Sequence, residues 1–297
     1  MMNDDEIKRL SQIYKMSDEL FENVKNETKF RLSANKSTTE KPTLVIVGGQ
    51  AGAGKSRLSP IVHRDFNDNI IQIDFDEIRA GHPRFKDVNE LYPEFTHRIL
   101  LEDTDRVQNT LLDEFRANKY NIIYEGTLRN TDGFINLASK FRKSGYNVEL
   151  YLMAVPELES LGSTYSRYAI DKIRNAKPRW VEKKAHDDSF TGLIKTLTIF
   201  QKKELFDYAK VFVRGDDEPK EIYSTDSRLF ASPVQAIEYG REIGRRDAVK
   251  NYPAKHDMVI SVLKDSPELL LRLSDWEKLY EEETFKLFPN GTVERNG

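Results

Sequence analysis

One stretch of the chain has the pattern GxxxxGK[ST]: Gly49-Gln50-Ala51-Gly52-Ala53-Gly54-Lys55-Ser56. An apolar, β-branched run at residues 43–47 precedes it and a helical pattern at 58–64 follows it. Glycines allow successive backbone N–H groups to turn toward an anionic phosphate, and the next helix points its positive end at the same place. Lys55 can bridge the β- and γ-phosphates, and the Ser56 hydroxyl can bind Mg²⁺. We therefore predict that all eight residues bind a nucleoside triphosphate.

Two carboxylates, Asp74 and Asp76, follow a second apolar run at residues 70–73. In a parallel sheet, ligands gather outside the carboxyl ends of the strands. Phosphoryl transfer to an alcohol needs a carboxylate that orients the hydroxyl and takes its proton. If the strand continues, both side chains lie on one side of it, so that one acts as base and the other is a second candidate for the metal. Alternatively both are solvated loop acids, or Asp76 caps a helix that begins at Glu77.

A third apolar run, residues 121–124, leads into Glu125, Thr127 and Arg129. Polar residues at this edge suit the binding of polar substrate groups. Glu125 has a structural alternative, in which it pairs with Lys55 or holds a neighbouring loop.

Negative charge develops on the phosphate while it is transferred, and positive side chains must offset it. Arginines on a lid typically supply this positive charge. Arg167 lies in a helical run with Asp171 one turn on, and Arg179 directly follows Pro178, which breaks the helix. This spacing predicts a lid, although a surface ion pair explains Arg167 and Asp171 equally well. Two histidines, His82 and His186, are further candidates for the site. Alternatively, each is a packing or hydrogen-bonding residue. Trp180 is either a core residue or stacks on a base.

The apolar runs that position these residues alternate with helical patterns. Five strands are predicted, at 43–47, 70–73, 121–124, 148–155 and 209–213. This alternation is typical of an α/β fold, P-loop kinase-like, with a mostly parallel sheet of about five strands covered by helices on both faces. The domain organisation predicted is a helical N-terminal segment and linker (1–42), a core (43–214) and a mainly helical C-terminal extension (215–297). The extension either packs on the core or binds a partner.

The 297 residues carry a formal net charge of −3, and cysteine is absent. Disulfides, thiolate nucleophiles and cysteine-type zinc sites are therefore excluded. The near balance of charge does not favour nucleic acid as a partner, despite a local cluster of Arg241, Arg245 and Arg246 with Lys250. The acidic start lacks the order of a signal peptide, and no apolar stretch is long enough to span a bilayer. A soluble cytoplasmic protein without a membrane partner is expected.

Taken together, these stretches resemble the zeta toxin family, P-loop kinases of bacterial toxin–antitoxin systems. The likeness covers about residues 43–190. It is carried by Gly48 to Ser56, Ile73-Asp74-Phe75-Asp76 with His82-Pro83, Tyr124-Glu125-Gly126-Thr127 with Arg129, Leu152 to Pro156 leading to Arg167-Tyr168, and Arg179 with Ala185-His186-Asp187.

The resemblance implies ATP- or GTP-dependent phosphorylation of the 3′-hydroxyl of the sugar in UDP-N-acetylglucosamine, which blocks synthesis of cell-wall precursors. Lys55 and Ser56 would hold the nucleotide phosphates and Mg²⁺, and Asp76 would be the general base. His82, Glu125, Thr127 and Arg129 would line the substrate site, and Arg167 and Arg179 would stabilise the transferring phosphate.

One position departs from the family pattern, because Asn109 stands where an acidic substrate-contacting residue is expected. An amide keeps hydrogen bonding but loses charge, so the acceptor could be another UDP-sugar, a nucleotide or an antibiotic. A nucleotide-hydrolysing switch module is the remaining alternative, although no Walker-B Asp-Glu pair or Asn-Lys-x-Asp motif supports it. The family's usual partner is a small helical antitoxin that blocks the nucleotide site with a helix. The chain's own first helix, residues 4–26, is a candidate for a similar role.

Overall fold

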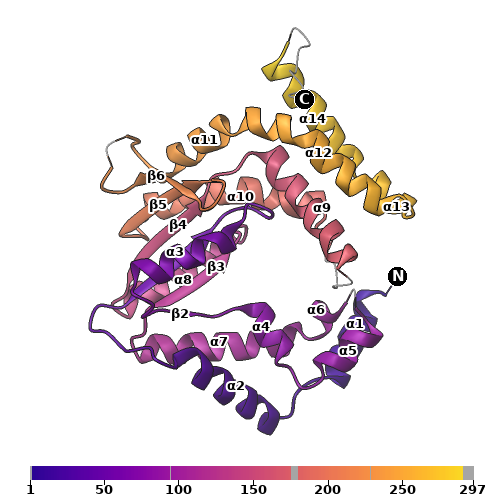
Figure 1. The fold of residues 1–297 in the computed structure, drawn as a ribbon. Coiled ribbons are helices and arrows are strands. Elements are labelled where there is room, and N and C mark those ends of the chain that lie inside the picture. Colours follow the sequence, from indigo (N-terminus) through magenta and orange to yellow (C-terminus); the bar gives the residue numbers. More distant parts are fainter. Residues whose placement is uncertain (1, 94, 175–179, 228, 290–297) are drawn as a thin grey trace. The chain divides into compact units, whose positions relative to one another are not determined.

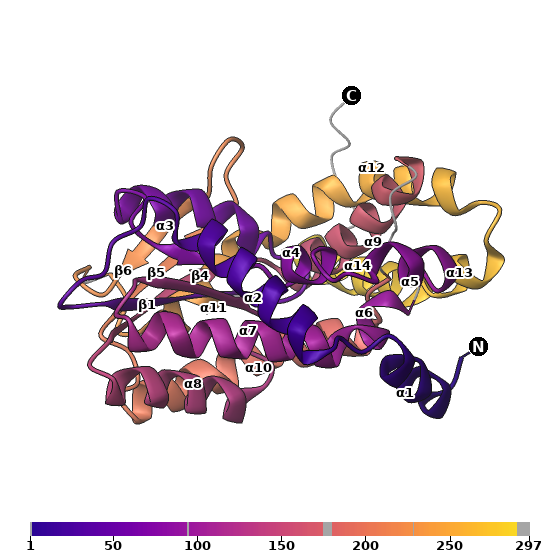
Figure 2. The ribbon, with the colours of Figure 1, turned by 90° about the horizontal axis from the view of Figure 1, so that it is seen from below.

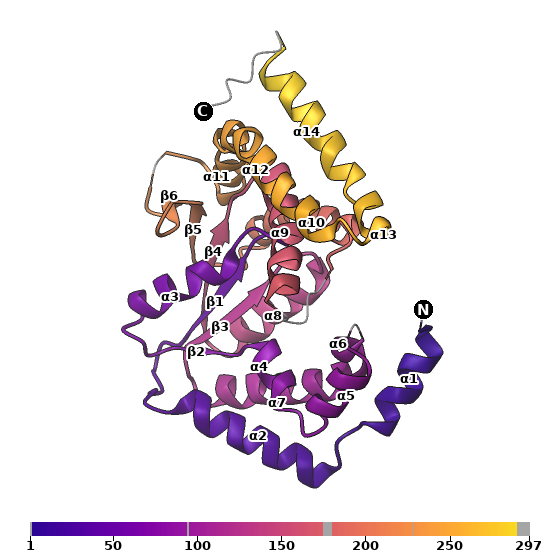
Figure 3. The same ribbon diagram turned by 45° about the vertical axis from the view of Figure 1, so that its right-hand side comes forward.

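The computed structural model describes residues 2–93, 95–174, 180–227 and 229–289. Within them, six strands form one sheet in the order β2-β3-β1-β4-β5-β6, shown in Figure 1 and, with all six strands labelled, in Figure 3. The strands are β1 (Thr43–Gly48), β2 (Ile71–Gln72), β3 (Ile122–Gly126), β4 (Asn147–Met153), β5 (Tyr208–Val213) and β6 (Lys220–Ser224). β2 pairs in parallel with β3, and β4 with β5, whereas β6 is antiparallel to β5. The predicted α/β class with a mostly parallel sheet is confirmed.

The sixth strand, β6, is absent from the sequence prediction. It lies at the edge of the sheet, and only Tyr223 of its five residues is buried. A short edge strand with a single buried position has no need of an apolar run, so the sequence of β6 shows no strand pattern. β1, in contrast, is buried at all six positions.

The helices alternate with the strands along the chain. Two precede β1: α1 (Asp4–Ile13) and α2 (Asp18–Ser33). Those between strands are η1 (Lys55–Leu58), α3 (Ser59–Asp65), α4 (Phe75–Ala80), α5 (Phe85–Leu91), α6 (Thr96–Ile99), α7 (Leu101–Ala117), α8 (Thr131–Lys143), α9 (Glu157–Ile173) and α10 (Lys183–Lys202). The C-terminal extension contributes α11 (Pro233–Ile243), α12 (Arg245–Leu263), α13 (Pro267–Leu271) and α14 (Ser274–Leu287). The Ser17 side chain accepts the Leu20 N–H at 3.3 Å and starts α2, so the first helix expected at residues 4–26 is in fact divided between two helices.

The chain divides into two compact units. Unit 1 comprises Met1–Val45, Val62–Tyr124 and Lys143–Asn147, and unit 2 comprises Ile46–Ile61, Glu125–Arg142 and Val148–Gly297. The division passes within β1, β3 and β4, so each of these strands contributes residues to both units.

In unit 1 the N-terminal helices pack on the helices that follow β2. α1 buries Ile7 and Leu10 in a cluster with Val88 and Ile99, while α2 lies along α7 (Figure 2). The Arg106 guanidinium of α7 sits 3.8 Å from the centre of the Phe21 ring of α2. The first two helices therefore pack as part of unit 1.

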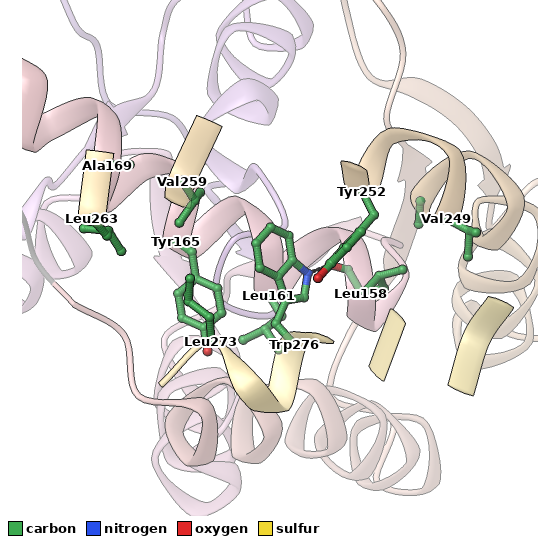
Figure 4. Close-up of a cluster of buried hydrophobic side chains, with 11 residues drawn as sticks. Leu158, Leu161, Tyr165, Ala169, Val249, Tyr252, Val259, Leu263, Leu273 and Trp276 are labelled. Atoms are coloured by element: carbon green, nitrogen blue, oxygen red, sulfur yellow. Dashed lines mark hydrogen bonds between the residues drawn. The ribbon is translucent and has the colours of Figure 1, made fainter. Parts of the chain in front are cut away.

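In unit 2 the C-terminal extension packs on α9, as the first of the two alternatives for this segment expected (Figure 3). Trp276 of α14 lies at the centre of the contact, with Tyr165 and Leu161 of α9 and Tyr252 of α12 around it (Figure 4). Its indole N–H donates to the Leu158 carbonyl at 3.2 Å. A Cβ at Gly162 would lie 2.4 Å from the Trp276 ring, so the indole fits only against a glycine at that position.

We expect Trp276→Ala to lower the free energy of unfolding by about 3–5 kcal/mol, because it removes a fully buried ring and leaves a cavity. Urea denaturation measures this change. Phe285→Ala on the same helix is the matched control: its ring is 73% exposed, and the expected change is within about 0.5 kcal/mol. Equal losses in the two variants would contradict the packing described for α14.

Candidate functional site

The phosphate loop, residues 49–56, leaves β1 and enters η1 with two glycines in left-handed conformations. Gly52 has φ +73° and Gly54 has φ +87°, a region that favours glycine. A Cβ at Gly52 would lie 2.0 Å from the Ser160 carbonyl oxygen, so the loop backbone presses directly on α9. Within the loop, the Gln50 carbonyl accepts the Ala53 N–H at 3.1 Å and the Lys55 ammonium at 3.2 Å. The motif thus forms the curved strand–loop–helix start that its sequence predicts.

Behind the loop, a buried polar network fixes the Gln50 side chain. Gln50 is 0% exposed, and its amide nitrogen donates to the Val155 carbonyl at 2.6 Å and to the Ser160 hydroxyl at 3.2 Å. The Ser160 hydroxyl lies 2.9 Å from Nε2 of His186. On the same helix as His186, the Ser189 hydroxyl accepts the Ala51 N–H at 3.0 Å. Helix α10 therefore supports the phosphate loop from its buried side.

The position of His186 explains its electrostatics. Burial lowers the pKa of His186, because the charged imidazolium loses water, and the neighbouring Asp187 carboxylate only partly opposes this shift. The neutral ring is the form that the network holds.

Arg214 is a residue of this site that the sequence analysis missed. Its guanidinium donates to the carbonyls of Gly52 and Ala53, to the Glu159 carboxylate and, at 3.0 Å, to the Ser163 hydroxyl. Burial lowers the pKa of Arg214 and the Glu159 charge opposes this, so the group stays cationic at neutral pH. Arg214 directly follows β5, so the rule applied to the other strand ends could have found it.

A second arginine, Arg57 of η1, holds the segment that follows Arg214. Its Nη2 donates to the carbonyls of Gly215, Asp216 and Asp217 at 3.2, 3.1 and 2.7 Å. Arg214 and Arg57 therefore join the phosphate loop and its η1 helix to residues 214–217.

The two carboxylates after β2 belong to unit 1 and have different surroundings. β2 ends at Gln72, so the condition for both side chains to share a strand face is not met. Asp74 caps α4, accepting the N–H of Asp76 at 2.7 Å and of Glu77 at 3.3 Å. Asp76 lies in the first turn, with its side chain 64% exposed and paired with Arg79. The cap that the sequence suggested for Asp76 is made by Asp74.

His82 is buried in unit 1, and both of its ring nitrogens have partners. Nδ1 accepts the Arg84 N–H at 3.1 Å, so Nε2 carries the proton and donates to Asp103 at 3.1 Å. The Met16 N–H also donates to that carboxylate at 2.7 Å. Burial alone would raise the pKa of Asp103, but these two hydrogen bonds hold it below its ordinary value. His82 is thus placed to join α7 to the loop after α4. Asn109 is exposed on α7, also in unit 1.

The residues after β3 follow an unusual turn in unit 2. Leu128 is fully buried at φ +53°, a left-handed conformation that costs a leucine energy. The Thr196 hydroxyl donates to its carbonyl at 2.7 Å and thereby holds the turn to α10. Thr127 is half-buried on one side of this turn, and Arg129 is exposed on the other, as is Glu125 at the end of β3.

The two predicted lid arginines have different outcomes. Arg167 is exposed on α9, while Arg179 lies outside the described residues. Trp180 stacks on Tyr165 with ring centres 4.9 Å apart and lies edge-on to Tyr168 at 5.1 Å. Of the two roles left open for Trp180, the structure favours packing.

The site residues therefore fall into two groups. Unit 2 contains the phosphate loop together with Glu125, Thr127, Arg129 and Arg167, and unit 1 contains Asp74, Asp76, His82 and Asn109. No group of three or more histidine, aspartate or glutamate side chains in the described ranges is arranged to hold a metal ion. None of the helices described combines the length and apolar character needed to cross a membrane.

The mostly parallel sheet, with a phosphate loop between its strand β1 and the following helix, defines an α/β protein of the P-loop class. Hydrogen bonds to α9 and α10 hold this loop in place. A family model for zeta toxin matches residues 26–227, about two thirds of the sequence, and the chain belongs to this family. Among similar proteins, the toxin zeta of Enterococcus hirae is 30% identical over 79% of this chain and 81% of that one. The toxin zeta of Streptococcus pyogenes is 28% identical over 87% of this chain and 91% of that one.

Solved structures show the same fold. A chain of the PezAT chromosomal toxin–antitoxin system of Streptococcus pneumoniae superposes with a TM-score of 0.72 at 22% identity, over 84% of this chain and 99% of that one. A chain of the AvrRxo1-ORF1:-ORF2 complex with ATP gives a TM-score of 0.54 at 12% identity, over 89% and 90%. The resemblance deduced from the motifs is confirmed.

We expect acid to destabilise the folded protein partly through His186. Its pKa is lower in the folded state, so the unfolded state binds more protons, and stability falls as the pH drops below about 6.5. Between pH 7.5 and 5.5 the wild type should lose more unfolding free energy than His186→Gln, which has no imidazole to protonate. Urea denaturation at both pH values measures this difference. An identical pH dependence in both proteins would show that His186 is not the group responsible.

Proposed function

We propose that the chain is a kinase that transfers the γ-phosphate of ATP or GTP to the 3′-hydroxyl of the sugar in UDP-N-acetylglucosamine and so blocks the synthesis of cell-wall precursors. The observation that carries this proposal is the phosphate loop, whose Gly52 and Gly54 adopt left-handed conformations directly before Lys55 and Ser56. Such a loop followed by a helix binds triphosphates through its backbone N–H groups. Membership of the zeta toxin family supports a toxic role.

Lys55 and Ser56 would hold the donor. Ser56 is exposed at the start of η1, and a hydroxyl is a suitable ligand for a hard cation such as Mg²⁺. The metal would be bound between this hydroxyl and the nucleotide phosphates, and Asp74, which caps α4 through Oδ1 alone, is the second candidate ligand. Bound Mg²⁺ neutralises charge that develops on the phosphate oxygens.

Asp76 is the better candidate for the general base. Asp74 accepts two backbone N–H groups through Oδ1 and is thereby oriented toward α4. The exposed Asp76 carboxylate, in contrast, pairs with Arg79 alone among the described residues. In the proposed reaction the acceptor hydroxyl gives its proton to Asp76, its oxygen bonds to the γ-phosphorus, and the nucleoside diphosphate leaves. Arg167 and Arg179 would offset the negative charge on the transferring group.

Glu125, Thr127, Arg129 and Asn109 are assigned to the acceptor, and the buried His82 to positioning. The amide at Asn109 favours a second candidate, a kinase for another hydroxyl acceptor such as a different UDP-sugar, a nucleotide or an antibiotic. Mass spectrometry of a metabolite extract incubated with ATP and the enzyme distinguishes these acceptors by the mass of the phosphorylated product.

We also propose a small helical antitoxin as partner, since the PezAT neighbour belongs to a toxin–antitoxin system. The chain's own first helices serve a different purpose in this proposal. They bury Ile7, Leu10 and Phe21 within unit 1 and so stabilise that unit.

The acceptor dependence of nucleotide turnover tests the proposed reaction. We expect release of ADP from ATP to rise when UDP-N-acetylglucosamine is added, and ³¹P NMR to place the new phosphate on the 3′-oxygen. A rate that is the same with and without any hydroxyl acceptor would instead support the nucleotide-hydrolysing switch.

We expect Asp76→Asn to lower kcat by about 10²- to 10⁴-fold, because an amide cannot take the proton of the hydroxyl. Nucleotide affinity, measured by calorimetry, should stay within about twofold, since Asp76 is not assigned to the donor. Glu77→Gln is the matched control, an exposed acid on the same helix turn paired with Arg31. Full turnover in Asp76→Asn would remove this residue from the mechanism.

A further inference from the structure

Two polar connections lead from the C-terminal extension to the phosphate loop, all within unit 2. The first begins at Arg241 of α11, whose Nη2 donates to the Gln50 side-chain oxygen at 3.3 Å and to the Phe190 carbonyl at 3.0 Å. Its guanidinium also lies 3.7 Å from the centre of the Phe190 ring. Because the Gln50 nitrogen already donates to Val155 and Ser160, Arg241 completes the hydrogen bonding of a fully buried loop side chain.

The second connection passes through Glu159 of α9. Its carboxylate is only 13% exposed and accepts from both Lys255 of α12 and Arg214. Arg214 in turn donates to the carbonyls of Gly52 and Ala53. A carboxylate shielded from water interacts more strongly with its two cations than an exposed pair would.

These contacts act on the orientation of the loop peptides. In a trans peptide the carbonyl and the next N–H point in opposite directions. The Arg214 Nε donates to the Ala53 carbonyl across 3.5 Å, which places the Gly54 N–H on the opposite side of that peptide. The same guanidinium also holds the Gly52 carbonyl, which turns the Ala53 N–H toward the Gln50 carbonyl that accepts it at 3.1 Å. A loop in which a carbonyl flipped inward would repel a phosphate.

We propose that the C-terminal extension is a brace for the phosphate loop and sets its affinity for nucleotide, with Arg241, Glu159 and Arg214 as positioning residues. This proposal rests on the nucleotide site of the proposed function. Burial lowers the pKa of Arg241 to about 10, with Glu157 and Glu238 opposing. Burying a cation costs free energy unless hydrogen bonds and nearby carboxylates offset the loss of water. For Arg241 these are the bonds to Gln50 and Phe190 and the charges of the two glutamates.

Arg241→Ala tests the brace, with Arg245→Ala as the matched control. Arg241 lines a cavity of about 230 Å³, so its removal enlarges an existing space and the variant is expected to fold. The described bonds of Arg245 go to Glu283 at 2.6 Å and Glu242 at 2.8 Å, both on the extension. Isothermal calorimetry with ATP should give about tenfold weaker binding for Arg241→Ala and a change within about twofold for Arg245→Ala. The KM for the acceptor should stay unchanged.

A double-mutant cycle shows whether Arg241 acts through Gln50. If it does, Gln50→Ala weakens ATP binding, and adding Arg241→Ala to it costs less than about twofold more. Losses that multiply, or equal losses in Arg241→Ala and Arg245→Ala, would overturn the proposal.

Hydrogen exchange in the nucleotide-free protein separates the brace from the proposed function. We expect the amides of residues 49–56 to exchange about fivefold faster in Arg241→Ala than in the wild type or Arg245→Ala. Unchanged exchange would overturn the brace. A wild type that binds no ATP would instead overturn the nucleotide site, while the exchange rates still decide whether the extension holds the loop.

Discussion

The close contact between the phosphate loop and α9 is the constraint on which the rest of unit 2 depends. Gly52 lies against the Ser160 carbonyl with no room for a Cβ, and Gln50 is bonded into the start of the same helix. Any shift of α9 is therefore transmitted to the loop backbone without a flexible side chain to absorb it. The packing of α9 against α12 and α14 around Trp276 gains functional meaning from this contact.

Two arginines beside the phosphate loop have two effects: their hydrogen bonds orient the loop, and their positive charge acts on whatever the loop binds. Arg214 and Arg241 are both arginines, whose planar forks donate to several acceptors at fixed angles, which a lysine ammonium does not do. Their positive charge favours an anion at the loop. Carboxylates of Glu157 and Glu159 reduce the cost of burying that charge. Geometry and electrostatics are thus supplied by the same side chains.

What the sequence predicted, and what it did not, follows from the range of the interactions. β1 and β4 are buried on both faces and had to be apolar runs, so their positions could be predicted, whereas the exposed edge strand β6 could not. Local motifs gave the phosphate loop. The cap of α4 depended on where β2 ends, which left Asp74 and Asp76 undecided. Arg241 meets Gln50 from 191 positions away, a contact that no local pattern reveals.

The turn after β3 positions two of the residues that we assign to the proposed acceptor site. Leu128 keeps its left-handed conformation because it is fixed from two sides: a Cβ at Gly48 would lie 2.4 Å from its side chain, and Thr196 bonds its carbonyl. Such a conformation costs on the order of 1–3 kcal/mol and persists only where its surroundings enforce it. The flanking Thr127 and Arg129 are less buried than Leu128. If these two residues contact the acceptor as proposed, substitutions there would alter the groups offered to it while the buried leucine keeps the turn and leaves the phosphate loop undisturbed.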